Sequence, residues 1–185
     1  MLDRLSLQFS TTANSWTLLP PFFPNWASVI IRRMSHSPFS HVDLVLPNGT
    51  LLGASDSPKA KVIAGNPRGV AIRPSNYEDY GRKRIMIIKT PLAEMIITAA
   101  MSQLNKPFDH DALYSFLSDA EPGERDWRAA DSWFCSELVV WAMEMSGFWF
   151  PASGTVWPKN RISPSDIFMV MLFDTRWINR DTFWL

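Results

Sequence analysis

The tripeptide Pro47-Asn48-Gly49 separates two short apolar runs and constrains the fold more than any other feature of the sequence. An Asn-Gly pair between strand-like runs is typical of a tight β-hairpin, because both residues accept the positive φ angles that a two-residue turn needs. We therefore expect His41–Leu46 to form a strand and Thr50–Ala54 to return antiparallel to it. The chain should contain an antiparallel sheet.

Further elements are expected on both sides of this hairpin. Hydrophobic periodicity predicts strands at 5–9, 70–73, 84–88 and 167–173, and helices at 26–34, 91–104 and 109–117, with a further helix after residue 131. Strands grouped in one block and flanked by helices, without regular alternation of the two, indicate an α+β fold.

The composition limits the class of protein. A chain of 185 residues with 46% hydrophobic residues fits a single domain, 1–185, with a core at about 5–170 and an aromatic C-terminal extension at 174–185. The 18 basic and 18 acidic side chains cancel, so we expect no nucleic-acid partner. No apolar run approaches the roughly 18 residues of a membrane span, and the first residues do not resemble a signal peptide. We expect a cytoplasmic protein, or one exported without a cleavable signal.

Cys135 is the only cysteine of the chain and lies where the helix after residue 131 begins. Asp131 or Ser132 can cap this helix, and Gly147 can end it. A thiol in the first turn lies at the positive end of the helix dipole, which favours the nucleophilic thiolate. The alternative interpretation is a buried structural cysteine, because free cysteine is among the most buried residue types.

A catalytic thiol needs an imidazole within hydrogen-bonding reach. Of the three histidines, His41 is the best candidate, because a strand holds it rigidly and its neighbours Val42 and Leu44 face the opposite side. His36 falls in an expected turn, and His110 falls near a helix start, where a capping or surface role is favoured.

An orienting residue for His41 can be sought across the hairpin. A two-residue Asn48-Gly49 turn places Asp56 opposite His41, with Ser55 beside it. Asp43, on the same strand face as His41, is a third candidate. Each of these polar residues can instead be a solvated turn residue.

Other kinds of site are not indicated. One cysteine and three histidines show no metal-ligand spacing, and the eight glycines form no phosphate-binding loop, so we expect no metal and no cofactor. Glu137 lies about 200° around the helix from Cys135, so we expect it to make a structural hydrogen bond.

The nine tryptophans and twelve phenylalanines predict a large aromatic core, an apolar cleft or a docking surface. The aromatic segment 176–185 is the best candidate for contact with a protein partner.

In combination, these segments resemble the circularly permuted branch of the NlpC-like, papain-like cysteine hydrolases, the YiiX-type group, which is related in fold to lecithin–retinol acyltransferase. In that family the histidine strand precedes the cysteine helix, as it does here, and the resemblance extends to small hydrolase-like proteins of bacteriophage genomes. The matching segments are 37–42, 48–49, 69–74, 107–109, 134–139 and 162–167, within a span of roughly 5–170.

The resemblance implies that Cys135 is the nucleophile, that His41 is the general base, and that the backbone N–H of Cys135 contributes to an oxyanion hole. It also implies a papain-like fold and, besides the cytoplasm, assembly in a phage virion. Many relatives carry an acidic or polar third residue on the strand after the histidine strand, and this chain has Gly53 where the acid would be expected.

The leading hypothesis is a thiol hydrolase that cleaves an amide or an ester through an acyl-enzyme intermediate, with a peptide or an acyl lipid as substrate. Trp133 and Phe134, next to the thiol, slightly favour a hydrophobic acyl group. An acyltransferase on the same Cys–His pair would need a second acceptor site. The hypothesis from another class is an inactive hydrolase-fold structural or interaction protein, such as a phage particle component.

Overall fold

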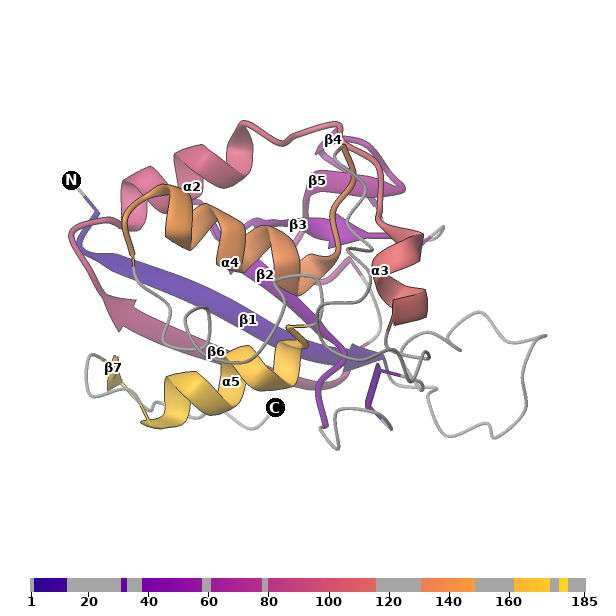
Figure 1. The fold of residues 1–185 in the computed structure, drawn as a ribbon. Coiled ribbons are helices and arrows are strands. Elements are labelled where there is room, and N and C mark those ends of the chain that lie inside the picture. Colours follow the sequence, from indigo (N-terminus) through magenta and orange to yellow (C-terminus); the bar gives the residue numbers. More distant parts are fainter. Residues whose placement is uncertain are drawn as a thin grey trace.

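An antiparallel sheet of seven strands forms the centre of the described part of the chain, in the order β4-β5-β3-β2-β1-β6-β7 (Figure 1). The computed structural model describes residues 2–12, 31–32, 38–57, 61–77, 80–115, 131–148, 162–173 and 177–179. The strands are β1 (Arg4–Thr12), β2 (His41–Val45), β3 (Leu51–Ser55), β4 (Ala64–Gly65), β5 (Gly69–Arg73), β6 (Tyr80–Lys89) and β7 (Trp177–Asn179). The helices are α2 (Ala93–Met101), α3 (His110–Ser115), α4 (Cys135–Met145) and α5 (Pro164–Phe173). The expected α+β class, a small antiparallel sheet packed with helices, is confirmed.

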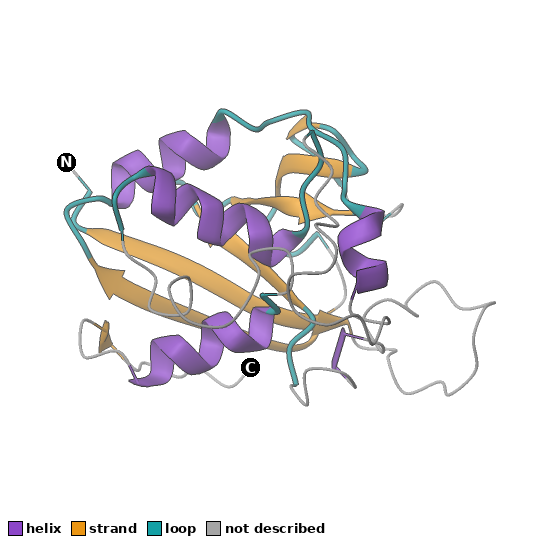
Figure 2. Cartoon of the chain, in the orientation of Figure 1, coloured by secondary structure: helices purple, strands orange, loops and turns teal. Residues whose placement is uncertain are grey.

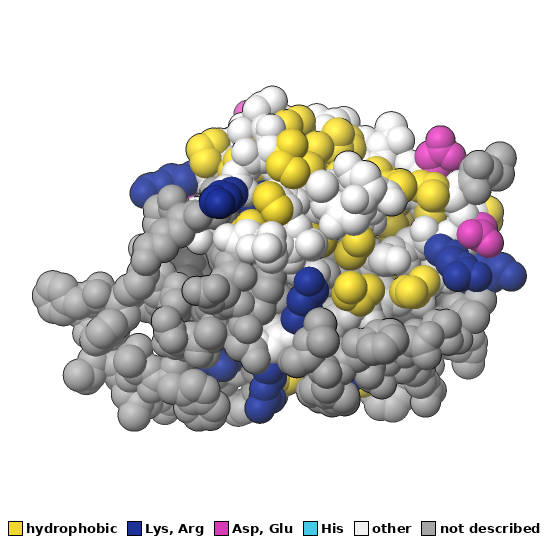
Figure 3. Space-filling view, turned by 180° about the vertical axis from the view of Figure 1, so that it is seen from behind, with side chains coloured by type: hydrophobic (Ala, Val, Ile, Leu, Met, Phe, Trp, Pro, Cys, Tyr) yellow, Lys and Arg dark blue, Asp and Glu magenta, His cyan; other side chains and the backbone are white. Residues whose placement is uncertain are grey.

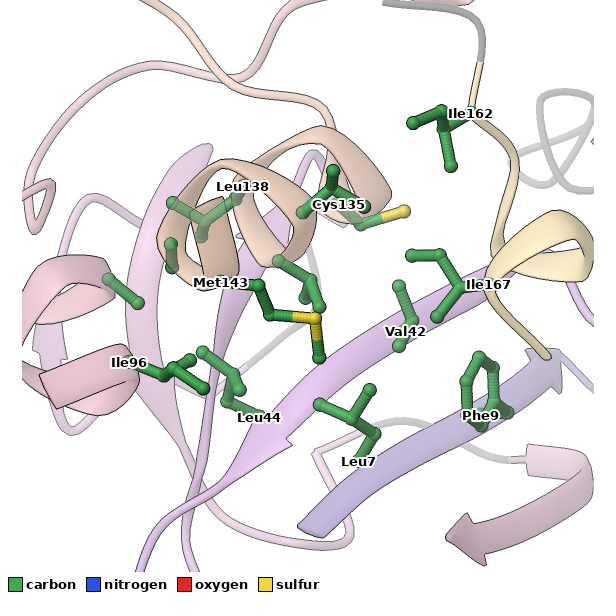
Figure 4. Packing of buried hydrophobic residues seen from close by; sticks show 14 of the residues in the cluster. Leu7, Phe9, Val42, Leu44, Ile96, Cys135, Leu138, Met143, Ile162 and Ile167 are labelled. Carbon is green, nitrogen blue, oxygen red and sulfur yellow. The ribbon is translucent and has the colours of Figure 1, made fainter. Parts of the chain in front are cut away.

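Helices α2, α4 and α5 lie on the same side of the sheet (Figure 2). The strands turn their alternate apolar residues toward these helices, and Leu7 of β1 and Leu44 of β2 are fully buried. Figure 4 shows Leu7 and Leu44 close to Met143 of α4. Helix α5 joins the same core through Phe168, whose ring centroid lies 5.3 Å from that of Phe9. Burial of this one apolar face is the main term that holds α4 on the sheet.

The opposite face of the sheet carries polar side chains at its centre. Gln8 pairs with Asp43 across β1 and β2, and Ser10 pairs with His41. Gln8, Ser10 and Asp43 are all buried, although none belongs to the apolar core. Figure 3 views the molecule from behind, where hydrophobic side chains are interspersed with white atoms, which belong to other side chains or to the backbone, and with a few Lys and Arg side chains. Most buried polar groups in proteins have hydrogen-bond partners, so this row of residues is where we look for chemistry.

The hairpin between β2 and β3 forms as expected, but its register differs by one residue from the prediction. Leu44 pairs with Leu52, and the Leu46 N–H donates to the Thr50 carbonyl at 2.8 Å. The loop therefore has three residues, and its last, Gly49, has a φ angle of 80°. A three-residue loop that ends in a left-handed glycine is the next most common hairpin after the two-residue turn.

The predicted strand at 167–173 is wrong, because these residues belong to helix α5. The helix is capped by Ser163, whose hydroxyl accepts the Asp166 N–H at 3.2 Å, while the Asp166 carboxylate accepts the Ser163 N–H at 2.8 Å. Pro164 takes the first helical position, which suits its fixed φ angle. A short apolar run fits a strand or a buried helix equally well, and here the capping residues decide.

The other predicted elements are close to the observed ones. The helices expected at 91–104 and 109–117 are shorter, at Ala93–Met101 and His110–Ser115. Of the helix expected at 26–34, only residues 31–32 are described, and they are helical. Of the aromatic extension 174–185, only Trp177–Asn179 is described, as β7 at the edge of the sheet. In the described part of the chain, every helix is too short or too polar to cross a membrane.

Candidate active site

The start of helix α4 is fastened to the sheet through the segment around Pro107. The Trp133 N–H donates to the Pro107 carbonyl, and the Asp109 N–H donates to the Trp133 carbonyl, both at 3.0 Å. Pro107 in turn bridges to Gly69 of β5, where an added Cβ would stand 2.9 Å from the Pro107 Cα. Three sequence segments thus converge on one place, immediately before Cys135.

Cys135 is the first residue of α4, as the sequence predicts. The predicted caps, Asp131 and Ser132, do not cap the helix, because Phe134 takes the N-cap position and Asp131 forms an ion pair with Lys106. Glu137 reaches back instead, and its carboxylate accepts the Phe134 N–H at 3.4 Å. The expected structural role of Glu137 is confirmed by this hydrogen bond. The Cys135 N–H remains in the first turn, where helix geometry leaves backbone donors without partners inside the helix.

His41 is the first residue of β2, and its ring is held by two other side chains. Nε2 lies 2.9 Å from Oδ1 of Asp43 and 3.0 Å from Oη of Tyr77. The Tyr77 hydroxyl donates to the second carboxylate oxygen, Oδ2, at 3.2 Å. A carboxylate can only accept hydrogen bonds, so Nε2 carries a proton and the Tyr77 oxygen accepts from it as well. His41, Asp43 and Tyr77 therefore form a closed ring of hydrogen bonds.

The electrostatic surroundings raise the pKa of His41. Burial by itself lowers the pKa of this imidazole, but the negative charge of Asp43, the charge of Cys135 and hydrogen bonds to both raise the pKa well above 6.5. The Cys135 thiol is therefore one of the groups that act on the pKa of His41. Because Asp43 and Tyr77 occupy Nε2, the nitrogen that is left to exchange a proton with the thiol is Nδ1. Figure 4 shows the Cys135 sulfur projecting from the start of α4, away from Leu138 and Met143.

The polar contacts of the predicted orienting residues Ser55 and Asp56 are with residues other than His41. The Ser55 hydroxyl accepts the Ser57 N–H at 3.2 Å. The Asp56 carboxylate lies 3.7 Å from Nε2 of His110 and 3.9 Å from Nε of Arg68, near the surface. The one-residue shift of the hairpin register moves Asp56 off the position opposite His41, and β3 pairs with β5 as far as Ser55. Asp43, the third candidate in the sequence, is the carboxylate that contacts His41.

The sequence did not single out Tyr77 and Arg73, which support this network. Arg73 is fully buried and donates to the carbonyls of Gly53 at 2.8 Å and Gly69 at 2.9 Å. Its guanidinium lies 5.4 Å from the centroid of the Tyr77 ring, within the range of a cation–π contact. The Tyr77 N–H donates to the Pro74 carbonyl at 3.2 Å, in a turn that follows β5. The segment 69–74, which includes Arg73, is part of the family resemblance, but the sequence assigns no chemical role to Arg73 or Tyr77.

His36 lies outside the described residues, and His110 lies on the surface with 54% of its side chain exposed.

Exposure also differs within the candidate site. Cys135 is 1% exposed, whereas the His41 side chain is 18% exposed. Among the described residues of the site, the imidazole is therefore the part that faces solvent.

Comparison with known proteins assigns no relative to the chain. A scan against protein-family models matches none of them, and a search of curated proteins finds no similar sequence.

Proposed function

We propose that the protein is a thiol hydrolase that cleaves an amide or an ester bond through an acyl-enzyme intermediate. Cys135 is the nucleophile, His41 is the general base and acid, and Asp43 orients His41. The observation that carries the proposal is that one imidazole contacts a buried carboxylate and has its pKa raised by that carboxylate and by a cysteine at a helix start.

Each neighbour of the imidazole has a distinct task in this proposal. Asp43 stabilises the positive charge that His41 carries when it holds the thiol proton. Tyr77 is a positioning residue, because its hydroxyl contacts Nε2 of the imidazole and the carboxylate of Asp43. The nitrogen that faces the thiol in this proposal is the other one, Nδ1. The start of helix α4 favours negative charge on the sulfur and on the oxygen of a tetrahedral intermediate.

The reaction proceeds in two halves. In acylation, a bond forms between Sγ and the substrate carbonyl carbon, the C–N or C–O bond breaks, and His41 passes the former thiol proton to the leaving nitrogen or oxygen. In deacylation, His41 takes a proton from water while the water oxygen attacks the thioester carbon. The C–S bond then breaks, the acid leaves, and the proton returns to the Cys135–His41 pair.

The proposal includes a papain-like fold of the circularly permuted NlpC type. The order of elements supports it, because the histidine strand β2 precedes the cysteine helix α4 and both pack in one α+β unit. The substrate class is a peptide or an acyl lipid. Phe134, the neighbour of Cys135 in the sequence, packs against Phe108 with ring centroids 5.6 Å apart, and these aromatic residues favour a hydrophobic acyl group.

Trapping of the acyl-enzyme tests this function. The protein is mixed with p-nitrophenyl acetate, p-nitrophenyl octanoate or an acylated peptide library, and its intact mass is followed with time. We expect the mass of one acyl group on Cys135, its absence in Cys135→Ser, and faster labelling by octanoate than by acetate. His110→Ala is the matched histidine control and should label like the native protein. No adduct from any of these reagents would contradict the proposal.

The burial of Cys135, which is 1% exposed, favours a second candidate. In this candidate the chain keeps a hydrolase-like fold as a structural or interaction protein, such as a phage particle component, and the thiol is part of the core. A native protein that reacts with neither esters nor small alkylating reagents would support it.

A further inference from the structure

We infer that Gly53 is a positioning residue of the proposed active site, because its missing side chain leaves the space in which the Asp43 carboxylate reaches His41. The inference rests on the proposed function for its catalytic meaning, but its structural part can be tested separately.

The two residues meet across the β2–β3 ladder. Leu44 pairs with Leu52, so the next position along the two antiparallel strands sets Asp43 against Gly53. A Cβ built on Gly53 would stand 3.0 Å from Cγ and 3.5 Å from Cβ of Asp43, and it would overlap Oδ1. This oxygen is the one that contacts His41.

The carboxylate cannot move aside without losing that contact. Its oxygens are held by His41 at 2.9 Å and by Tyr77 at 3.2 Å, and Asp43 is fully buried. The backbone of Gly53 is also held, because the Arg73 guanidinium donates to its carbonyl at 2.8 Å. Even one methyl group at position 53 must therefore push Asp43 away from His41 or displace β3.

The same overlap has a second consequence. The side chain of a larger residue at position 53 would enter the volume that the Asp43 carboxylate now fills. A carboxylate supplied from β3 can therefore replace one supplied from β2, provided that the side chain at position 43 is removed.

The first test is Gly53→Ala, with the titration of His41 followed by NMR of its ring protons. The charged groups that act on His41 are Asp43 and Cys135, while Tyr77 contacts it as a neutral hydroxyl. We expect the pKa of His41 to fall toward its ordinary value of about 6.5. We also expect kcat/KM for a p-nitrophenyl ester to fall about 10²-fold, as a 1 Å misplacement can cause.

Gly49→Ala is the matched control. It is also a glycine-to-alanine change in this hairpin, and it strains a residue with a φ angle of 80°, but its added Cβ meets no atom within 4 Å. It should lower stability and leave the titration of His41 unchanged. A Gly53→Ala protein in which His41 titrates as in the native protein would overturn the inference.

The second test exchanges the two side chains. Asp43→Gly should lower the pKa of His41, and the double variant Asp43→Gly with Gly53→Asp should raise it again and restore part of the activity. Failure of the double variant to raise this pKa above that of Asp43→Gly would also overturn the inference. If the titrations behave as expected but native Cys135 never forms an acyl-enzyme, the proposed function fails. The inference that Gly53 leaves the space for the Asp43 carboxylate still holds in that case.

Discussion

Nε2 of His41 lies 2.9 Å from Oδ1 of Asp43, two residues further along the same strand. Residues i and i+2 of a strand point to the same face, so an His-x-Asp sequence can form this pair without help from another element. The pair is local in the sequence, but its burial requires the strands on both sides.

Asp43→Asn should lower the pKa of His41, because it removes one of the two negative charges that, together with hydrogen bonds, outweigh the effect of burial. In the native protein the folded-state pKa of His41 exceeds the unfolded value of about 6.5. The stability that the imidazolium contributes is therefore fully present below pH 6.5 and is lost as the pH rises through the raised folded-state pKa. Urea unfolding midpoints measured against pH should show this loss, and Asp43→Asn should flatten the curve.

Asp56→Asn is the matched carboxylate control for that experiment. Asp56 is the residue that a two-residue hairpin turn would have placed opposite His41, and it instead lies near Arg68 and His110. Its removal should leave both the titration of His41 and the acylation of Cys135 unchanged. A loss of acylation as large as that of Asp43→Asn would show that the register seen here is not that of the working protein.

Tyr77→Phe should act on the orientation of His41 rather than on substrate binding. The change keeps the ring over Arg73 and removes the hydroxyl that touches His41 and Asp43. Loss of a buried hydrogen bond costs about 1–2 kcal/mol of stability. We expect kcat to fall with little change in KM, and the ¹⁵N shift of Nε2 of His41 should change because one of its two hydrogen-bond partners is lost. An unchanged Nε2 shift together with an unchanged kcat would remove Tyr77 from the site.

Arg73→Met should destabilise the protein strongly. Arg73 is fully buried and donates to the carbonyls of Gly53 and Gly69, which the variant leaves without these donors. The expected loss in the free energy of unfolding is about 2–4 kcal/mol, measured by urea denaturation. Arg68→Met is the control, because the Arg68 side chain is 68% exposed and its ion pair with Asp56 should contribute less than about 1 kcal/mol. Equal losses in the two variants would contradict the role given to Arg73.

The parts of the fold that were predicted correctly depend on local signals. The Asn48-Gly49 turn and the alternation along β2 are short-range features, and they sufficed to predict the hairpin and to select His41. The cysteine was also correctly predicted at the start of α4. Gly147, with a φ angle of 74°, follows the end of this helix, as expected.

The parts that were missed depend on residues far apart in the sequence. The position of Asp56 relative to His41 depends on one residue of hairpin register, and the local sequence fits a two-residue or a three-residue loop. Tyr77 comes close to His41 through a turn that follows β5. Hydrophobic periodicity predicts that β5 is a strand, but it does not predict where this strand lies in the sheet. Helix α5 was mistaken for a strand because its apolar run is short, although Ser163 and Asp166 carry the capping pattern.

The most direct test of the central claim is the rate of iodoacetamide alkylation of Cys135 as a function of pH. It should be measured in the native protein, in His41→Ala and in His110→Ala. We predict that native Cys135 reacts rapidly at pH 7, that His41→Ala shifts the rise in rate toward the pH of an ordinary thiol, about 8.5, and that His110→Ala changes nothing. A native thiol that reacts slowly at pH 7, with no response to the loss of His41, would contradict the claim that these two residues form a catalytic pair.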